Sequence, residues 1–500
     1  MNVHKLFKCL SLAVLFLVAP IAPRVQAQTL TVLHSFTDAD GAYPVTVLVR
    51  DAAGNLYGAT QGGGSTGYGT VFKIDTSNTE TVLHSFTNTP DGALPDGGLI
   101  TDGAGNLYGI ALGDSANGVG TVFKVDTSNN TETILHTFTN TPDGAFPVGS
   151  LVRDAAGNLY GTTQTGGSAN LGTVFKIDTS NTETILHSFT NTPDGSQPFG
   201  SMVMDAAGNL YGTTNQGGAS GFGTVFKLDT SNNTETVLHS FAGLDGRFPA
   251  AGLIMDAAGN IYGTTGQGGA DYGPMNTAWG TVFKIDTSNT ETVLHSFTNT
   301  PDGQGPNSVL TLDAAGNLYG TTVFGGASGL GTVFKIDTSN TETVLHSFTG
   351  AEGSQPAAGL ILDSAGNLYG TASRGTSNAG TVFELIQTIP VTIDIKPGQD
   401  PPSINTKNRG TIPVAILSTP TFDALTQVNQ TSLTFGRTGS EKSLAFCSDA
   451  TDVNGDGLPD LICNFNTVLT GFQAGDTTGV LEGKTVNGTI IMGSDSVIVH

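Results

Sequence analysis

The sequence predicts an all-β fold, in which a seven-bladed β-propeller closed by its N-terminal strand precedes a small β-sandwich. Three observations predict it: three short strings recur seven times in fixed order, the two ends of the repeat array complement each other, and turn residues dominate the composition. Gly supplies 69 of the 500 residues, and the sequence has no long apolar-periodic helical run. A single hydrophobic core rarely serves a chain of this length. We therefore expect a repeat architecture with an added domain.

The repeat is marked by the strings L-H-S/T-F, A-G-N-L/I-Y-G and G-T-V-F, which follow one another in every unit. The histidines recur every 50 to 56 residues, a period typical of solenoids and propellers. The marker residues of the three strings are His34, His84, His136, His187, His239, His295 and His346; Tyr57, Tyr108, Tyr160, Tyr211, Tyr262, Tyr319 and Tyr369; and Phe72, Phe123, Phe175, Phe226, Phe283, Phe334 and Phe383.

Each unit reads as four short strands. In the third unit these are VGSLVRD, NLYGTT, GTVFKID and TETILHSF, joined in turn by D-A-A-G-N, a Gly-rich loop and D-T-S-N. We expect Gly and Asn of the D-A-A-G-N turn to adopt left-handed backbone conformations. As in a strand, Thr173, Phe175 and Ile177 are expected to point to one side, and Val174, Lys176 and Asp178 to the other. Four-stranded units of about 50 residues are typical of propeller blades.

The two ends of the array support a closed ring. Residues 29–36 form a lone fourth strand before any first strand, and the last unit stops after its third strand at residues 380–386. Pairing the two completes the seventh blade and removes an exposed sheet edge. An open β-solenoid is the alternative, but it does not need this complementary truncation.

The core strings D-A-A-G-N-L-Y-G-T-T and G-T-V-F-K make residues 29–386 resemble the GloVer-type tandem repeats of secreted bacterial proteins. The resemblance implies export and a repeated β unit, without catalytic residues to carry over. Residues 391–499, with V-T-I-D-I-K-P-G and I-P-V-A-I-L, resemble a C-terminal module that recurs in secreted bacterial proteins. That likeness implies a role in attachment or stabilisation.

The N-terminus has the features of a secretory signal, with Lys5 and Lys8, the apolar run 10–18 and the small-residue end Val25-Gln26-Ala27. The run is too short to span a bilayer, and no later stretch is long enough, so we expect no membrane insertion.

The net charge of -23 repels phosphate backbones and excludes nucleic acid as a partner. The expected segments are a signal peptide at 1–27, the propeller at 28–387 and the β-sandwich at 388–500, in a secreted protein.

The repeated polar residues are expected to be structural. Seven equivalent histidines lack the single differentiated setting that catalysis needs, so we expect each to make a hydrogen bond between blades. Gly58 and its six equivalents lie within a strand, where they are expected to admit a neighbouring blade. One acidic residue per blade precedes a Gly, which favours seven Asp-Gly turns. A ring of carboxylates that attracts cations to a channel mouth is the alternative reading. These residues are Asp40, Asp91, Asp143, Asp194, Asp245, Asp302 and Glu352.

One loop of the fifth unit differs from its counterparts. It reads GQGGADYGPMNTAWG, is several residues longer, and contains Asp271, Tyr272 and Trp279, the sole tryptophan of the sequence. Its aromatic side chains are candidates for stacking on a sugar, and Asp271 for binding sugar hydroxyls. The alternative is an insertion that packs on its own surface.

The C-terminal module contains one chemical motif, D-V-N-G-D-G-L-P-D. Asp452, Asn454, Asp456 and Asp460, with the carbonyl of Leu458, occupy the ligand positions of a Ca²⁺ loop. Cys463 stands at position 12, where a helix-loop-helix site has Glu, and this favours a strand-flanked Ca²⁺ loop of the integrin type. Asp449 is a candidate for the missing ligand. The alternative is an Asp-Gly turn that binds no metal.

Cys447 and Cys463 are the two cysteines that remain once the expected signal peptide is removed. In an exported protein they form either a disulfide or two buried thiols.

These features favour a secreted binding or structural protein. Its propeller is expected to bind an extracellular glycan or protein, and Ca²⁺ is its expected cofactor. We expect no enzyme activity. The alternatives are a polysaccharide-active glycosidase or lyase, since propellers host such enzymes, and a cell-surface adhesion component. An enzyme needs unique His, Arg and carboxylate residues that converge on one cavity.

Overall fold

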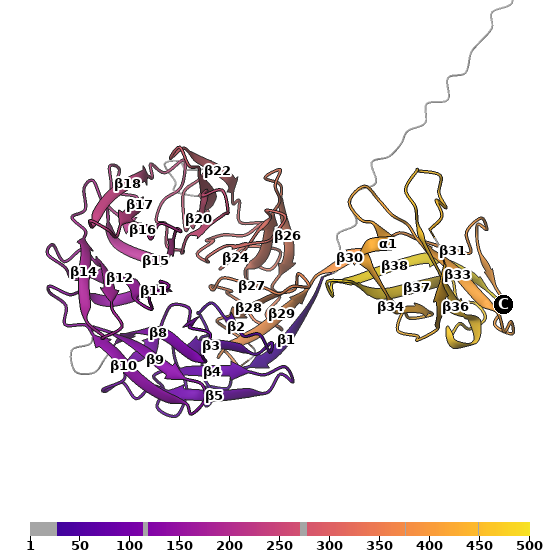
Figure 1. Cartoon of the computed structure of the whole chain (residues 1–500), viewed down its shortest axis with the longest axis horizontal. Helices are drawn as coiled ribbons and strands as arrows, with labels where there is room; N and C mark the ends of the chain where they lie inside the picture. The colour runs from indigo at the N-terminus through magenta and orange to yellow at the C-terminus, as the bar shows by residue number, and fades with distance from the viewer. Residues whose placement is uncertain (1–27, 114–118, 271–277, 376, 449) are drawn as a thin grey trace, which may run out of the picture.

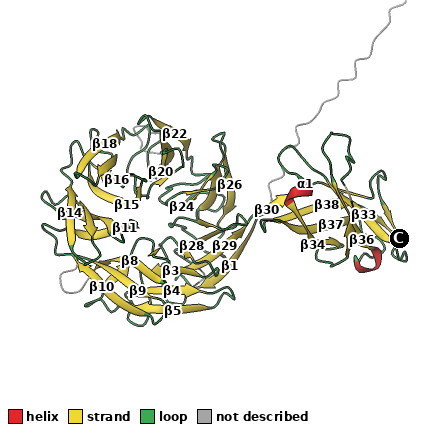
Figure 2. Cartoon of the chain, in the orientation of Figure 1, coloured by secondary structure: helices red, strands yellow, loops and turns green. Residues whose placement is uncertain are grey.

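The computed structural model describes residues 28–113, 119–270, 278–375, 377–448 and 450–500. Seven β-sheets stand around a central space, and a second group of sheets lies beside them at the C-terminal end (Figure 1). Helix is confined in the described residues to α1 (Ala424–Gln427) and the short 3-10 turn η1 (Thr467–Leu469), as Figure 2 shows. The predicted all-β fold is confirmed. The expected signal peptide, residues 1–27, lies outside the described residues.

Each of the seven sheets is built from consecutive antiparallel strands of one repeat, with one exception in the last sheet. The first four sheets contain β2 (Val49–Arg50), β3 (Leu56–Thr60), β4 (Thr70–Ile74) and β5 (Glu80–Ser85); β6 (Ala93–Pro95), β7 (Ile100–Thr101), β8 (Asn106–Gly113), β9 (Thr121–Asp126) and β10 (Thr131–Thr137); β11 (Ala145–Arg153), β12 (Leu159–Thr165), β13 (Thr173–Ile177) and β14 (Glu183–Ser188); and β15 (Ser196–Met204), β16 (Leu210–Gln216), β17 (Thr224–Asp229) and β18 (Thr234–Ser240).

The last three sheets follow the same order. They contain β19 (Ile254–Met255), β20 (Ile261–Thr265), β21 (Thr281–Ile285) and β22 (Glu291–Ser296); β23 (Thr311–Leu312), β24 (Leu318–Thr322), β25 (Thr332–Ile336) and β26 (Glu342–Ser347); and β27 (Ile361–Leu362), β28 (Leu368–Ala372), β29 (Thr381–Ile386) and β1 (Thr29–Ser35).

The seventh sheet combines the two ends of the repeat array. β1 pairs antiparallel with β29 from Thr29 opposite Ile386 to Ser35 opposite Thr381, with one bulge between Val32 and His34. The backbone amide of Phe36 continues this pairing by donating to the carbonyl of Gly380, 3.0 Å away. The strand expected to be spare at the N-terminus therefore occupies the outer edge of the last unit.

The D-A-A-G-N turn between the first two strands is held by its aspartate. Asp154 accepts hydrogen bonds from the amide and the side-chain nitrogen of Asn158, at 2.8 and 2.7 Å, and from the hydroxyl of Tyr160 at 3.1 Å. Gly157 has a φ of 92°, but Asn158 is not left-handed, contrary to our expectation, because its side chain is directed at Asp154. The left-handed Asn belongs to the D-T-S-N turn, where Asn181 has a φ of 62°.

The electrostatics of this turn follow from the hydrogen bonds. Burial raises the pKa of Asp154, but the bonds from Asn158 and Tyr160 outweigh burial and hold it below its usual value. Burial and the neighbouring Asp154 raise the pKa of Tyr160 to about 12. The carboxylate therefore remains ionised and the phenol protonated across the physiological range.

The glycine within the second strand makes room inside its own sheet. Gly161 lies opposite Phe175 on the next strand, and a Cβ atom at this position would come within 2.4 Å of the Phe175 ring. The expectation that these glycines admit a neighbouring blade is therefore wrong. The aromatic ring of the adjacent strand fills the place of the missing side chain.

Neighbouring sheets contact each other through a second set of phenylalanines. The Phe after each outer strand packs edge-to-face on the G-T-V-F Phe of the next sheet, with ring centroids 5.0 to 5.4 Å apart. The pairs are Phe36–Phe72, Phe86–Phe123, Phe138–Phe175, Phe189–Phe226, Phe241–Phe283, Phe297–Phe334 and Phe348–Phe383. The contact between the seventh and first sheets is of the same kind as the other six.

The C-terminal residues form two four-stranded sheets and one two-stranded sheet. One sheet has the order β30-β38-β37-β34, the second β31-β33-β36-β35, and β32 pairs with β39. The strand bounds are β30 (Thr388–Pro390), β31 (Ile393–Ile395), β32 (Ser403–Ile404), β33 (Thr411–Ile416), β34 (Val428–Gly436), β35 (Leu444–Cys447), β36 (Leu461–Asn466), β37 (Thr478–Thr485), β38 (Ile490–Ser496) and β39 (Ile498–Val499).

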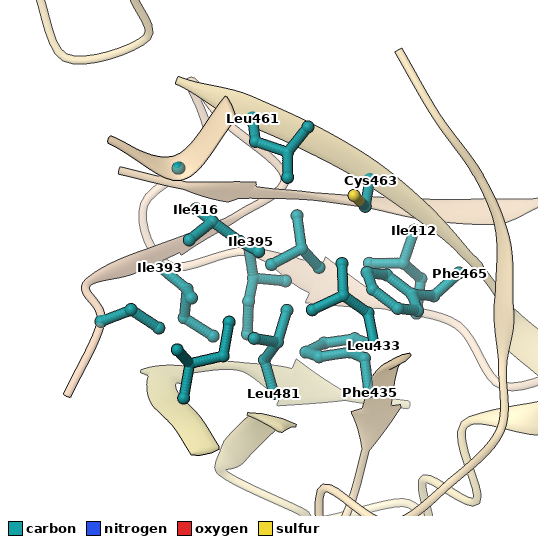
Figure 3. Packing of buried hydrophobic residues seen from close by; sticks show 14 of the residues in the cluster. Ile393, Ile395, Ile412, Ile416, Leu433, Phe435, Leu461, Cys463, Phe465 and Leu481 are labelled. Carbon is teal, nitrogen blue, oxygen red and sulfur yellow. The ribbon is translucent and has the colours of Figure 1, made fainter. Parts of the chain in front are cut away.

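The core of this region lies between the two larger sheets. Figure 3 shows Ile395 and Phe465 of one sheet pointing toward Phe435 and Leu481 of the other. All four side chains are fully buried. Burial of such apolar side chains stabilises the fold by about 1.5 to 3 kcal/mol each.

Candidate functional site

The loops of the seven sheets lie at two ends that differ in sequence variation. A bridge between Ala42 and Gly62 joins the connection before a first strand to the Gly-rich loop before a third strand. At the other end, the Thr127 hydroxyl of a D-T-S-N type turn donates to the carbonyl of Gly105 in a D-A-A-G-N type turn, 2.8 Å away. The variable loops therefore share one end.

A histidine and an acidic residue pair at every junction between sheets. Each outer-strand histidine contacts the acid of the following connection through Nε2, at 2.8 to 3.4 Å. The acids are mostly buried; Asp194, for example, is 4% exposed. Neither partner lines the central cavity described below. The histidines are thus paired at the junctions, as expected, and the acids pair with them there. The carboxylate ring that attracts cations stays an alternative prediction.

The pKa values at these junctions reflect burial and pairing. Burial lowers the pKa of His84 and His136 despite the adjacent aspartates. Burial also raises the pKa of Asp302, but hydrogen bonds from His295 and Thr298 outweigh it and bring that pKa below its usual value. Asp302 therefore stays ionised at neutral pH.

A glutamate near the start of an outer strand lies close to six of these pairs. In each, the carboxylate oxygen Oε1 is buried and has no hydrogen-bond partner among the described residues. Burial, with a further contribution from the neighbouring aspartate, raises the pKa of these carboxyls to about 7. The residues are Glu80, Glu132, Glu183, Glu235, Glu291 and Glu342. Sequence reasoning missed them, although their regular place in the T-E-T string was the available signal.

The central space contains a cavity of about 280 Å³. Its lining comes from all seven repeats and consists largely of Gly, Ala, Val and Ser, with Asp96 as the charged residue among the described ones. Gln61 donates a hydrogen bond to the Asp96 carboxylate at 2.7 Å. Burial raises the pKa of Asp96, and the bond from Gln61 lowers it only in part.

Sequence reasoning also missed Asp96. Asp96 follows the Pro of its repeat. The residue at this position varies more among the seven repeats than the residues of the three repeated strings do. The seven residues at this position are Val45, Asp96, Val148, Phe199, Ala250, Asn307 and Ala357. A variable position within an otherwise uniform repeat was the signal that could have identified it.

A second pocket, of about 340 Å³, lies between the fifth and sixth sheets. Trp279, half-buried against the core of these sheets, lines it together with Phe324, which is 44% exposed. Gln267, Gln304 and Asn307, which carry side-chain amides, also line the pocket. Two aromatic rings and three amides from two repeats therefore converge at the variable end.

The sequence predicted only part of this pocket. Trp279 is in it, whereas Asp271 and Tyr272 lie outside the described residues. Gln304 and Asn307 come from the next repeat, so no reading of the long loop alone could have found them. Arg247 donates to Gln267 and fixes the orientation of that amide.

The predicted Ca²⁺ loop connects β35 and β36. Asp452 accepts from the amides of Gly455, Asp456 and Gly457 at 2.7 to 3.2 Å, which wraps the backbone around its carboxylate. Asn454 donates to the carboxylate of Asp456 at 3.0 Å, so these two side chains lie together at the exposed rim.

Asp460 and Leu458 lie in the same loop. Asp460 is fully buried and accepts from the amides of Ser418 and Val453, both at 2.8 Å. Its carboxylate therefore also fixes the loop to the segment that follows β33. The amide of Leu458 donates to Asp456 at 2.8 Å.

Cys463 forms a disulfide with Cys447, which resolves the choice left open by the sequence and removes Cys463 as a ligand. Asp449, a candidate for the missing ligand, lies outside the described residues.

Among the residues placed by the structure, no helix has the length and apolarity required to cross a membrane.

The comparison with solved structures found two structures of one extracellular domain from B. thetaiotaomicron and one enzyme. The extracellular domain of a hybrid two-component system from B. thetaiotaomicron matches with a TM-score of 0.50 and 12% identity, over 71% of this chain and 39% of that one. The extracellular domain of a one-component system from the same organism matches with a TM-score of 0.49 and 12% identity, over 79% of this chain and 46% of that one. A gluconolactonase from Xanthomonas campestris matches with a TM-score of 0.38 and 15% identity, over 61% of this chain and 88% of that one. This chain thus spans less than half of either of these two extracellular domains.

No curated protein matches the sequence. A family model described as the Gloeobacter/Verrucomicrobia repeat matches four overlapping stretches, residues 20–205, 78–276, 172–382 and 272–413. Together these stretches cover all seven repeats, and the resemblance to GloVer-type repeats is confirmed. The chain belongs to the Gloeobacter/Verrucomicrobia repeat family.

Proposed function

We propose that the protein is a secreted binding protein whose seven sheets are the blades of a closed β-propeller. What supports closure is the junction between the seventh and first sheets, which repeats the Phe–Phe and His–Asp contacts of the other junctions through Phe36–Phe72 and His34–Asp40. The apolar cluster at this junction includes Phe36 with Ala379 and Leu48, so it joins both ends of the array. Closure makes the ring a rigid support for its loops.

We further propose that the ligand is an extracellular glycan bound at the pocket between the fifth and sixth sheets. The observation that carries this proposal is the convergence of Trp279 and Phe324 with three side-chain amides. Aromatic rings stack on the apolar faces of sugars, and amides can both donate to and accept from hydroxyl groups. The pocket volume, about 340 Å³, is in the range of small-ligand sites.

A glycan array screened with the mature protein tests this proposal. We expect binding to a restricted set of neutral glycans, a loss of at least tenfold in affinity for Trp279→Ala, and an intermediate loss for Gln304→Ala. Phe446→Ala is the matched control, since Phe446 is an exposed aromatic residue of β35 in the C-terminal region. Glycan binding that survives both pocket substitutions would contradict the proposal.

A polysaccharide-active enzyme is the second candidate, and Asp96 is the observation that favours it. A partly buried carboxyl with a raised pKa is suited to act as a general acid. Glycoside hydrolysis ordinarily also needs a second carboxylate about 5 to 10 Å away, and Asp96 is the one acid among the described residues of the cavity lining. A reducing-sugar assay on the glycans that bind separates the candidates: hydrolysis abolished by Asp96→Asn would favour the enzyme.

For the C-terminal region we propose a stabilising Ca²⁺ ion in the loop 452–460. Asp452, Asn454 and Asp456 supply hard oxygen donors at its rim, and the carbonyl of Leu458 can add another. Asp460 is the further acidic ligand expected from the motif. Its hydrogen bonds to Ser418 and Val453 leave lone pairs on both oxygens, so coordination and anchoring are compatible.

A further inference from the structure

Three side chains with metal-binding atoms meet where the closing strand β1 contacts the first sheet. His34 lies on β1, Asp40 in the connection that follows, and Glu80 at the start of β5. The distance from His34 Nε2 to Asp40 Oδ2 is 3.0 Å, and one ligand atom from each residue lies within 4.8 Å of the other two. All three side chains are partly buried. They come from three segments, so folding of the ring is what assembles them.

The cluster contains unsatisfied negative charge. Asp40 Oδ1 accepts from the amide and hydroxyl of Thr37, at 2.8 and 3.1 Å, which leaves Oδ2 to face His34. Glu80 Oε1 is buried without a hydrogen-bond partner and lies close to Asp40. Two neighbouring carboxylates require a compensating positive charge, since buried charges are costly unless paired or bound to a metal. A proton or a metal ion can supply it.

The length of the connection distinguishes this junction from most others. Six residues separate His34 from Asp40, whereas the T-N-T-P-D-G connections separate the pair by seven, as in His187 and Asp194. This junction is the one in the described residues where the three ligand atoms meet within 4.8 Å. At the junction of the sixth and seventh sheets, Leu30 takes the place of the glutamate.

We propose that His34, Asp40 and Glu80 bind a divalent transition metal ion of the zinc type. One imidazole and two carboxylates form a donor set that suits Zn²⁺, whereas Ca²⁺ prefers oxygen ligands alone. Water can complete the coordination shell because the side chains are only partly buried. The ion neutralises the two carboxylates and links β1 to the first sheet. The site therefore differs in metal preference from the Ca²⁺ loop of the C-terminal region.

Calorimetric titration of metal-free, untagged mature protein with ZnCl₂ tests the proposal. We expect one Zn²⁺ site that CaCl₂ does not fill, and an affinity at least tenfold lower for Glu80→Gln. Glu183→Gln is the matched control. Glu183 holds the equivalent place beside His136 and Asp143, which are seven positions apart in the sequence, so its substitution should leave the Zn²⁺ affinity unchanged. Melting curves in EDTA check that both variants fold. Absence of Zn²⁺ binding, or equal affinity of Glu80→Gln and the unaltered protein, would overturn the proposal.

A second measurement needs no variant. Diethyl pyrocarbonate modifies accessible imidazoles, and mass spectrometry locates the modified residues. His34 and His187 are similarly exposed, with 17% and 19% of their side-chain surfaces accessible. We expect one equivalent of Zn²⁺ to slow modification of His34 at least fivefold and to leave His187 unaffected. Equal rates for His34 with and without Zn²⁺ would exclude the site.

Discussion

The aspartate of each D-A-A-G-N turn accepts several hydrogen bonds at once, so its loss leaves several donors unpaired. Asp205 accepts from the amides of Ala207 and Asn209, the Asn209 side chain and the Tyr211 hydroxyl, at 2.7 to 3.0 Å. Hydrogen bonds to a charged acceptor contribute more than neutral ones. These turns fix the second strand of every sheet.

We predict that Asp205→Ala lowers the free energy of unfolding of the ring by about 2 to 3 kcal/mol. Tyr211→Phe removes one of the bonds and should cost about 1 kcal/mol. Urea unfolding followed by the fluorescence of Trp279, the sole tryptophan of the sequence, measures both changes in the ring. An Asp205→Ala protein as stable as Tyr211→Phe would show that the aspartate does not hold the turn.

The buried glutamates make the ring sensitive to pH. Burial, with a contribution from Asp143, raises the pKa of Glu183 from 4.5 to about 7. Between pH 4.5 and pH 7, the folded protein therefore binds more protons than the unfolded chain. The contribution of Glu183 to the free energy of unfolding falls as the pH rises through this range, and it is fully lost above pH 7. The lowered pKa values of His84 and His136 act in the opposite direction below pH 6.5.

We predict that Glu183→Gln stabilises the ring at pH 8 and leaves its stability almost unchanged at pH 4.5. Solvent screens the half-exposed carboxylate, so the gain at pH 8 is expected to be only about 1 kcal/mol. Thermal unfolding of both proteins at the two pH values provides the comparison. The prediction fails if the variant melts at the same temperature as the unaltered protein at pH 8.

Among the separate elements, the hairpin of β35 and β36 combines a disulfide, a buried aspartate and the proposed Ca²⁺ loop. Without the ion, Asp452 and Asp456 place two exposed carboxylates within a few residues of each other. Binding of an ion to the folded loop stabilises it by mass action, and the effect grows with the ratio of free ion to Kd.

We predict that EGTA lowers the melting temperature of the C-terminal region and that added Ca²⁺ restores it. Asp452→Asn should reduce the response to Ca²⁺, and Asp476→Asn, outside the loop, should leave it intact. Calorimetry resolves this transition from that of the ring. A melting temperature indifferent to EGTA would argue against the site.

Sequence patterns predicted the elements better than their contacts. The hairpins around Gly157 and Asn181 follow from local turn residues, and the pairing of β1 with β29 follows from the missing strand of the last repeat. The partner of Gly161 was assigned wrongly, because register across a sheet decides which ring fills the space. Local sequence does not specify that register.

The candidate sites were predicted less completely than the fold. Trp279 was found because it breaks the repeat, and the Ca²⁺ loop because its ligands are close in sequence. Asp96, Gln304 and Glu80 act with residues of other repeats or segments, and only the folded ring brings these partners together.

At the scale of the whole molecule, the pairing of β1 with β29 joins the two ends of the repeat array. This pairing accompanies the Phe36–Phe72 contact and places His34 beside Asp40 and Glu80. Deletion of residues 28–36, which removes both β1 and Phe36, would expose the edge of β29 and the ring of Phe72. A ring that depends on β1 should therefore be much less stable, and more prone to aggregate, without it.

A cross-link between the two ends of the array tests closure most directly. Thr31 on β1 lies opposite Glu384 on β29, and Thr29 lies opposite Ile386. We predict that the paired substitutions Thr31→Cys and Glu384→Cys form an intramolecular disulfide in the folded protein, identified by mass spectrometry of the linked peptides. Thr31→Cys with Ile386→Cys, two residues out of register, should link far less. Equal linkage of both pairs, or none in the first, would contradict the closed ring.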